Sequence, residues 1–245
     1  MLLVLLAVPA FAAQYKTGEE VLAAMHDKYS GKWYKTLTFQ QTTINYKPDG
    51  TSQSAIWYEA ITVPGKLRID FAPLEKGDGL IVADGKIYQF REGKLANSRD
   101  FVHPLLVLGF DVYGQPVAAT TAQLKGLGID MSVVHEETWQ DGTAVVVGAK
   151  QGDLRTPQFW IDKKKLVFVR LIQLTGKDKT TVQETQFNKY EKAKGGGWVS
   201  AEVKFFTDGK LATSEDYANI QTGKTLSPDL WDPNKWTSVD KNYVK

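Results

Sequence analysis

The residue types that most often do chemistry are sparse in this sequence, and they stand in no catalytic or metal-binding pattern. Its three histidines, His26, His103 and His135, are far apart, and none has the spacing of a metal motif such as His-Glu-x-x-His. The glycine run 195–197 is not followed by Lys-Ser or Lys-Thr, so it does not fit a phosphate-binding loop. No motif combines a nucleophile, a base and an orienting group. The sequence therefore favours a binding protein over an enzyme, and it predicts neither a cofactor nor a metal site.

Two charged groups have more than one interpretation. Asp229 and Asp232 could bind a cation, although solvation in a loop explains them more simply. The lysine run 163–165 lies between two predicted strands, where it is either a solvated turn or a contact with a membrane or partner protein. The absence of cysteine excludes disulfides, thiol catalysis and Cys-ligated metal, as well as lipid attachment to an N-terminal cysteine.

The composition is that of a folded, nearly neutral protein. Hydrophobic residues make up 42% of the 245 residues, which is enough for a sizeable core. The formal net charge of +2 gives no electrostatic reason to expect binding to nucleic acid. No linker and no shift in composition divides the chain, so residues 13–245 are predicted to form a single domain.

The first residues have the pattern of a secretion signal. Leu2–Val8 is an apolar run of signal-peptide length that is too short to span a bilayer. Ala10, Phe11 and Ala12 fit the small-x-small cleavage rule, which predicts a signal peptide over residues 1–12 and a protein exported to the periplasm. The usual basic residues before the apolar run are missing, so the printed start is compatible with a position inside a longer signal. The alternative is a buried N-terminal strand or helix.

The chain after this segment is predicted to form one helix followed by many hairpins. Thr17 and Glu20 fit a capping box, and apolar residues follow at helical spacing, which predicts an amphipathic helix over Glu19–Tyr29. Turn signals such as Asp84-Gly85 then recur along the chain. Because consecutive hairpins pair neighbouring strands, this pattern predicts an antiparallel meander.

The stretch Val63–Phe90 is the most informative part of the predicted sheet. Its first strand alternates apolar Leu67, Ile69 and Phe71 with charged residues, which is the period of a strand with one face buried and the other in water. A turn rich in Pro and Gly, a short apolar strand and a hairpin follow. We expect this stretch to form one wall of a curved sheet.

A leucine-rich segment, Phe101–Gly128, interrupts the strands. Pro104 suits the first position of a helix, and Gly114 and Pro116 break the segment, so short helices are predicted there. The predicted fold class is mainly β (α+β). It is an open, strongly curved antiparallel sheet of about eleven strands, an incomplete barrel, with an N-terminal helix and short lid helices.

Aromatic side chains are numerous in the predicted strands, and two interpretations stay open. They either form an ordinary core under the helices or line a concavity that short helices cover only in part. In the second case the apolar concavity is the default ligand site. We expect the following residues to line the cavity and its lid: Trp57, Leu67, Ile69, Phe71, Tyr88, Phe90, Leu105, Leu106, Leu108, Phe110, Trp160 and Phe168.

Several of these stretches resemble a known family. The capped helix, the run VPGKLRIDF…LIVADGKIYQF and the leucine-rich insert resemble the LolA-type periplasmic lipoprotein carriers. The later stretches FWIDKKKLVFVRLIQL, FNKYEK and FFTDGK are similar to the second half of those proteins. The same general pattern occurs in a wider group that includes the outer-membrane acceptor LolB and the sensor RseB. The resemblance covers most of the chain after residue 12.

The resemblance implies an incomplete antiparallel barrel whose hollow accepts acyl chains of lipoproteins or lipids under a lid of helices. It also implies an inner-membrane donor and an outer-membrane acceptor as partners. In the carriers an arginine before a proline helps to close the lid, whereas here Val63 precedes Pro64. The first hypothesis is therefore a soluble periplasmic carrier that transfers acyl chains toward the outer membrane. The alternative is an RseB-like envelope sensor or interaction module.

Overall fold

The computed structural model describes residues 15–244, which form a single curved antiparallel sheet with helices on its concave side. The predicted signal peptide, residues 1–12, lies outside the described residues. The strands are β1 (Thr36–Tyr46), β2 (Ser52–Thr62), β3 (Lys66–Phe71), β4 (Gly79–Ala83), β5 (Lys86–Arg91), β6 (Lys94–Asp100), β7 (Val134–Trp139), β8 (Gly142–Val147), β9 (Gln158–Asp162), β10 (Phe168–Thr175), β11 (Thr181–Lys192), β12 (Trp198–Thr207) and β13 (Lys210–Thr222).

The open, curved antiparallel sheet is confirmed, but it has 13 strands instead of about eleven. One strand that the sequence did not reveal is β6. All of its residues are exposed, and it has no apolar alternation to mark it as a strand. It pairs with β5 and forms one edge of the sheet, while β7 forms the other edge.

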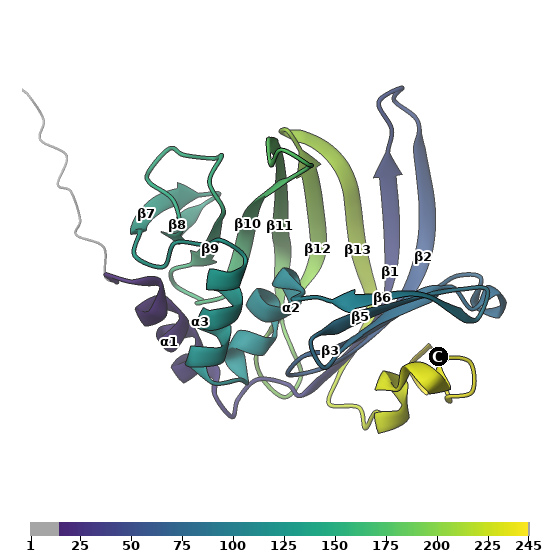
Figure 1. The fold of residues 1–245 in the computed structure, drawn as a ribbon. Helices are drawn as coiled ribbons and strands as arrows, with labels where there is room; N and C mark the ends of the chain where they lie inside the picture. The colour runs from purple at the N-terminus through teal and green to yellow at the C-terminus, as the bar shows by residue number, and fades with distance from the viewer. Residues whose placement is uncertain (1–14, 245) are drawn as a thin grey trace, which may run out of the picture.

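The sheet consists of two meanders that meet in the middle. Strands β1–β6 pair in chain order, and so do strands β7–β13. The join is the antiparallel pair of β1 and β13, in which Thr38 lies opposite Gln221. Figure 1 shows how the sheet bends, so that β3–β6 extend forward from the wall formed by the other strands.

Helix α1 (Gly18–Tyr29) confirms the predicted amphipathic helix, and its cap differs from the expected box in one bond. Thr17 Oγ1 accepts a hydrogen bond from the amide of Glu20 at 3.2 Å. The Glu20 carboxylate accepts from the amide of Lys16 at 2.7 Å instead of from Thr17. Both bonds satisfy donors at the helix start, which would otherwise have no partner.

The leucine-rich segment forms the predicted short helices. They are α2 (Pro104–Gly109), the 3-10 turn η2 (Asp111–Tyr113) and α3 (Val117–Gly126). Helix α2 starts with Pro104, and His103 Nδ1 caps it by accepting from the amide of Leu106 at 3.2 Å. In Figure 1 helices α1, α2 and α3 lie inside the curve of the sheet. Among residues 15–244, no helix is long and apolar enough to cross a membrane.

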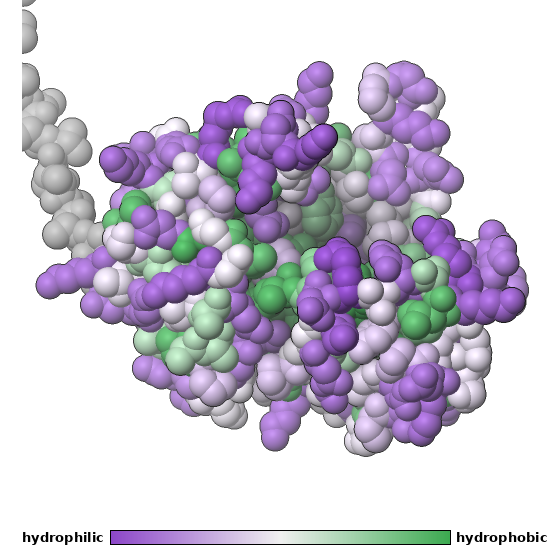
Figure 2. All heavy atoms as spheres, viewed as in Figure 1, coloured by the Kyte–Doolittle hydropathy of each residue, from purple (hydrophilic) through white to green (hydrophobic). Residues whose placement is uncertain are grey.

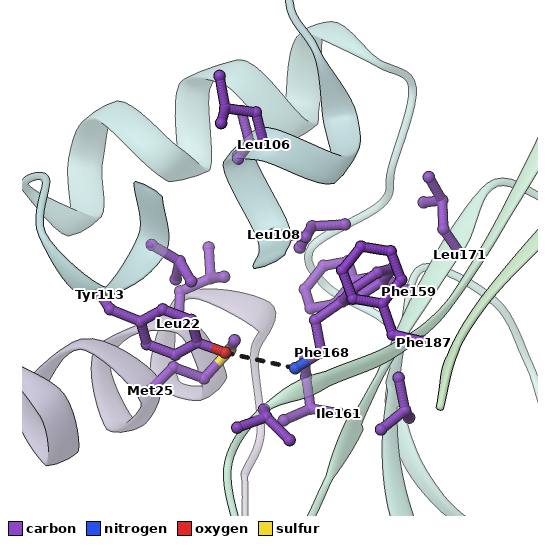
Figure 3. Close-up of a cluster of buried hydrophobic side chains, with 14 of the residues drawn as sticks. Leu22, Met25, Leu106, Leu108, Tyr113, Phe159, Ile161, Phe168, Leu171 and Phe187 are labelled. Atoms are coloured by element: carbon purple, nitrogen blue, oxygen red, sulfur yellow. Dashed lines mark hydrogen bonds between the residues drawn. The ribbon is translucent and has the colours of Figure 1, made fainter. Parts of the chain in front are cut away.

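The main core lies between these helices and the concave face of β8–β11. Leu22 and Met25 of α1 pack there with Phe159, Phe168 and neighbouring residues, as Figure 3 shows. The amide of Phe168 donates to the hydroxyl of Tyr113, from η2, at 3.4 Å. The helices thus fill one half of the hollow with ordinary core.

A second core lies on the convex face, under the C-terminal segment. This segment contains η3 (Pro228–Trp231), η4 (Pro233–Lys235) and η5 (Asn242–Val244). Its Leu230, Trp236 and Tyr243 pack against Ile81 and Phe90 of the sheet. Figure 1 shows the segment, in yellow, on the side of β3–β5 that faces away from the helices.

Candidate ligand-binding site

The half of the hollow that the helices do not fill contains an apolar cavity of about 250 Å³. It lies between α2 and the concave face of β1–β4 and β11–β13. In Figure 2 hydrophobic residues are visible at the bottom of a hollow in this face of the molecule. The lining residues are Phe39, Trp57, Glu59, Ile61, Leu67, Ile69, Leu80, His103, Leu105, Leu106, Phe110, Phe187, Phe205, Glu215 and Tyr217.

Strand alternation and register place these side chains. On β2 every second residue from Trp57 to Ile61 faces the cavity, because successive side chains point to opposite faces of a sheet. Each lies opposite an inward residue of β3, as in the pair of Ile61 with Leu67 and the pair of Glu59 with Ile69. Cross-strand pairs of this kind share a face, so the two strands form a continuous wall.

Half of the predicted site residues line this cavity. They are Trp57, Leu67, Ile69, Leu105, Leu106 and Phe110. Phe71 lies beside them, since its ring centroid is 4.7 Å from that of Trp57. The sheet wall and the leucine-rich lid that the sequence indicated are therefore brought together.

Three other predicted residues are buried away from the cavity. Leu108 and Phe168 have no exposed surface and Trp160 is 2% exposed. Leu108 and Phe168 pack among the helices and β8–β11, where the space is filled with side chains. Trp160 lies between Phe159 and Ile161, which point toward the helices, so it points to the opposite face of β9 and the prediction that it faces the cavity is corrected. Its Nε1 donates to Gln158 Oε1 at 2.8 Å, and the guanidinium carbon of Arg170 lies 4.6 Å from its ring centroid. The concave face of this half is an ordinary core, which is the simpler of the two interpretations that the aromatic residues allowed.

Tyr88 and Phe90 of β5 face the convex side, so the prediction that they face the cavity is corrected. Phe90 stacks on Trp236 with a centroid distance of 4.2 Å, and Tyr88 packs against the same convex cluster. The inward residue of this strand is Ile87, which belongs to the main core. Both faces of β5 carry apolar residues, so alternation alone could not show which face points inward.

The sequence did not indicate the most unusual residues of the cavity, which are two carboxyl groups. Glu59 on β2 is 6% exposed and Glu215 on β13 is 8% exposed. Tyr217 donates to Glu215 Oε2 at 3.0 Å, and its ring stacks on Phe39 at 4.2 Å. Among the described residues no hydrogen-bond donor reaches the carboxyl group of Glu59. Glutamate is normally exposed unless it is paired, so a buried glutamate without a hydrogen-bond donor is unusual.

Burial controls the protonation of both groups. It raises the pKa of Glu215 to about 7, against which the hydrogen bonds from Tyr217 and Gln41 act only in part. It also raises the pKa of Glu59 well above the ordinary value, and the negative charge of Glu215 adds to this shift. Both carboxyl groups therefore hold a proton more strongly than a glutamate in water.

His103 adds one polar group on the lid side. Its Nδ1 accepts the hydrogen bond that caps α2, so in the neutral ring the proton lies on Nε2. Burial lowers the pKa of His103 to about 4, which keeps the ring neutral at physiological pH. The structure thus makes His103 a helix cap that also faces the cavity.

The lid, which consists of α2, η2 and α3, is attached to the β2–β3 turn. This turn contains Val63, which stands where the carriers have an arginine. Asp111 of η2 accepts a hydrogen bond from the amide of Gly65 at 2.8 Å, and burial raises the pKa of Asp111 to about 7. Gly114 lies close to Val63, since a Cβ added at Gly114 would be 3.1 Å from a Val63 methyl group. Contacts of Asp111 and Val63 therefore join the lid to this turn.

A larger, more polar cleft of about 710 Å³ lies at the ends of β7–β11 and includes the lysine run 163–165. Lys163 pairs with Glu136 at 2.8 Å, and Lys165 lies 3.6 Å from Asp162. These pairs are those of a solvated turn. Phe187 lines both spaces and stands between the cleft and the apolar cavity.

The remaining candidate residues show no metal geometry. Within residues 15–244 no group of three or more His, Cys, Asp or Glu side chains is arranged to hold a metal ion. Asp229 pairs with Lys235 at 2.8 Å, and Asp232 accepts from the amide of Asn234 at 2.9 Å. The two aspartates thus stabilise the turns of the C-terminal segment.

Comparison with solved structures identifies the fold. A DUF1329 family protein from Desulfovibrio piger matches with a TM-score of 0.59 at 15% identity, over 88% of this chain and 95% of that one. A putative outer membrane lipoprotein-sorting protein domain from Vibrio parahaemolyticus matches with a TM-score of 0.60 at 9% identity, over 89% and 97%. The fold is LolA-like. A LolA superfamily protein from Nitrosomonas europaea agrees, with a TM-score of 0.53 at 8% identity over 86% and 95%.

Sequence comparisons add nothing to this result, since no family model and no curated protein matches the chain. At identities of 8–15% the structural matches show the LolA-like fold alone. A shared fold does not define the function, which depends on the site that this chain forms.

Proposed function

We propose that this protein is a carrier that buries the acyl chains of lipoproteins or lipids in the cavity between α2 and the concave face of the sheet. The observation that carries the proposal is the cavity itself. It is lined by Leu105, Leu106 and Phe110 on the lid side and by apolar residues of β2 and β3 on the sheet side. Concave sites with apolar walls and a few polar groups are the usual form of a small-molecule site.

Such a carrier works by reversible burial, and no bond is made or broken. Burial of each methylene contributes roughly 0.8 kcal/mol, so a chain of about 16 carbons gains on the order of 10 kcal/mol. Removing the same chain from a membrane costs a similar amount. The free energy of moving the chain from a membrane into the carrier is therefore close to zero. We expect the protein to need a donor for loading and an acceptor with higher affinity for release.

The lid must move for a long chain to fit. The present volume of about 250 Å³ lies just below the roughly 300–1,000 Å³ of typical small-molecule sites. Helix α2 has only 6 residues, and its Leu105 and Leu106 point into the cavity. We infer that displacement of α2 away from the sheet enlarges the cavity, with the contact between Asp111 and Gly65 as the attachment of the lid.

The proposal includes a location and partners. Export to the periplasm by the signal over residues 1–12, an inner-membrane donor and an outer-membrane acceptor together suit a carrier of acyl chains. N-terminal sequencing of the protein recovered from cells tests the location. We expect the mature chain to begin at Ala13.

Binding of a fluorescent fatty acyl probe tests the carrier function directly. The variant Leu105→Arg places a long cationic side chain in the cavity. We expect it to weaken probe binding at least tenfold, since the side chain takes up apolar space and its guanidinium can pair with Glu59 or Glu215. The matched control is Leu95→Arg on β6, because Leu95 is 53% exposed. Circular dichroism would verify that both variants fold.

Two results would contradict the proposal. The first is wild-type protein that neither binds the probe nor carries lipid detectable by mass spectrometry after purification. The second is equal binding by the Leu105→Arg and Leu95→Arg variants, which would place the probe outside the cavity. Either result would favour the alternative, an interaction module of the RseB kind.

A further inference from the structure

The two carboxyl groups of the cavity have no counter-charge. Glu59 and Glu215 extend from β2 and β13, the two strands that flank β1, and both line the same space. No lysine or arginine is among the described residues that line it, and the other titratable groups there are Tyr217 and His103. A chain that needed only to hold hydrocarbon would gain nothing from acidic side chains at this position.

We propose that the cavity selects an amphiphile whose apolar chain ends in a protonated amine, and that this ammonium group pairs with Glu59. The inference rests on the proposed function, because it names the polar end of the ligand that the apolar walls hold. Glu215, which accepts a hydrogen bond from Tyr217, supplies a second carboxyl group to the same space.

The environment of Glu59 favours an ammonium group over other polar ends. The carboxyl of Glu59 is buried and accepts no hydrogen bond from the described residues, so it is free to pair with a ligand. A carboxylate end group could form no ion pair with Glu59, because ionisation of Glu59 would place two negative charges side by side. A hydroxyl group would offer hydrogen bonding without charge, whereas an ammonium offers donors and also stabilises the ionised form of Glu59.

Ligand binding is coupled to proton release in this arrangement. Burial keeps Glu59 and Glu215 protonated in the empty cavity to a higher pH than usual. An ammonium stabilises the ionised form of Glu59, so the proton leaves to solvent when the ligand binds. Tyr217 remains a hydrogen-bond donor to Glu215, and the His103 ring, which caps α2, remains neutral.

Three probes of equal chain length separate the contributions of chain and end group. Isothermal titration calorimetry at pH 7 would compare dodecylammonium, 1-dodecanol and laurate below their micelle concentrations, with wild type, Glu59→Gln and Glu215→Gln. The control variant is Glu75→Gln, which changes an exposed glutamate in η1 (Leu74–Lys76). Titration in buffers of different ionisation enthalpy reports the released proton.

We expect wild type to bind dodecylammonium at least tenfold more tightly than 1-dodecanol, and laurate more weakly than either. Glu59→Gln should abolish this preference and the proton release while leaving dodecanol affinity within about threefold. Glu215→Gln should reduce the preference several-fold, and Glu75→Gln should not change it. The Glu215→Gln result keeps the test valid even if Glu59→Gln fails to fold.

Equal affinities for dodecylammonium and dodecanol in wild type would overturn the inference, as would an unchanged preference in Glu59→Gln. A preference for laurate would also overturn it, and would leave the carrier function standing. Failure of all three probes to bind would overturn the carrier function together with the inference. The two failures are therefore distinguishable.

Discussion

The two faces of strands β2 and β3 bury acidic residues in opposite ways. On the convex face, Asp70 is completely buried under the C-terminal segment and is surrounded by partners. Arg68 donates two hydrogen bonds to its carboxylate, at 2.7 and 3.1 Å, while Lys241 and Tyr243 complete its environment. On the concave face, Glu59 is almost as buried and has no donor from the described residues.

The side chains around Arg68 explain why the convex face tolerates charge. The guanidinium carbon lies 3.9 Å from the ring centroid of Trp236, whose other face stacks on Phe90. Arg68 also donates to the carbonyl of Trp236 at 2.9 Å. Burial alone would raise the pKa of Asp70, but the hydrogen bonds and charge of Arg68, with Lys241 and Tyr243, hold it below the usual value.

The two acidic residues differ in whether the chain itself supplies a counter-charge. The partners of Asp70 are part of the chain and fasten the C-terminal segment to the sheet. No Lys or Arg among the described residues lines the cavity beside Glu59 and Glu215, so ionisation of these carboxyl groups lowers the stability of the protein.

Removing the charge of Arg68 should have the largest effect. Arg68→Met leaves the Asp70 carboxylate buried beside only Lys241 and Tyr243, and breaking a buried pair in this way costs about 3–5 kcal/mol. The free energy of unfolding in urea, measured at pH 7, would show this loss. Arg91→Met on β5 is the control, because Arg91 is exposed.

The double variant Arg68→Met, Asp70→Leu sharpens this test. It replaces both charges by apolar groups, which should restore more than half of the lost stability. A loss below about 1 kcal/mol for Arg68→Met would mean that the convex pair does not fasten the C-terminal segment.

Neutralising a concave carboxyl should stabilise the protein at high pH. Because the folded pKa of Glu215, about 7, lies above its ordinary value, its contribution to stability is complete below about pH 4.5 and is lost as the pH rises through 7. Glu215→Gln removes this loss and should raise the free energy of unfolding at pH 8.5 by about 3 kcal/mol relative to wild type.

The pH dependence separates the two faces in one experiment. The lowered pKa of Asp70 gives stability that is present above its unfolded pKa and is lost as the pH falls through the folded value. Urea titrations from pH 3 to 9 should therefore show losses at both ends. Glu215→Gln should reduce the alkaline loss, which Glu59 and Asp111 also cause, and should leave the acid loss unchanged. A variant that is no more stable than wild type at pH 8.5 would show that Glu215 ionises without cost.

Removing one hydroxyl group from each face should give the smallest effects. Tyr243→Phe removes a hydrogen bond to the ionised Asp70 and should cost about 2 kcal/mol, since bonds to charged groups are the stronger ones. Tyr217→Phe removes a bond to Glu215 and should cost about 1 kcal/mol at pH 5, where Glu215 is protonated. Equal losses in urea titrations at this pH would contradict the distinction between the two faces.

Local sequence signals predicted the elements well, because turns and caps depend on neighbouring residues. Asp84-Gly85 forms a hairpin turn with positive φ at both positions, 51° and 73°, as that pair of residues favours. The Thr17 cap and the breaks around α2 have the same local origin. Strand β6 was missed because it has no alternating pattern of its own. It is a strand because it pairs with β5.

Burial that depends on distant segments was not predictable. The alternation in β3 indicated that Arg68 and Asp70 face water, and both are completely buried. They are covered by residues such as Trp236, which are far away in the sequence, and no local pattern reports that contact. The same limit applies to Phe90 on the convex face and to Glu59 in the cavity, since the face that a strand residue takes is set by what packs there.

The central pair of strands has a consequence for how the chain folds. Strand β1 lies near the start of the chain and is synthesised early. On one side it pairs with β13, which lies near the end of the chain. Until that partner is available, β1 is an open edge that can pair with other chains. Contacts between such distant residues slow folding, so the two meanders are expected to form before the seam between them closes. Aggregation during refolding should therefore depend on the time that β1 spends without β13.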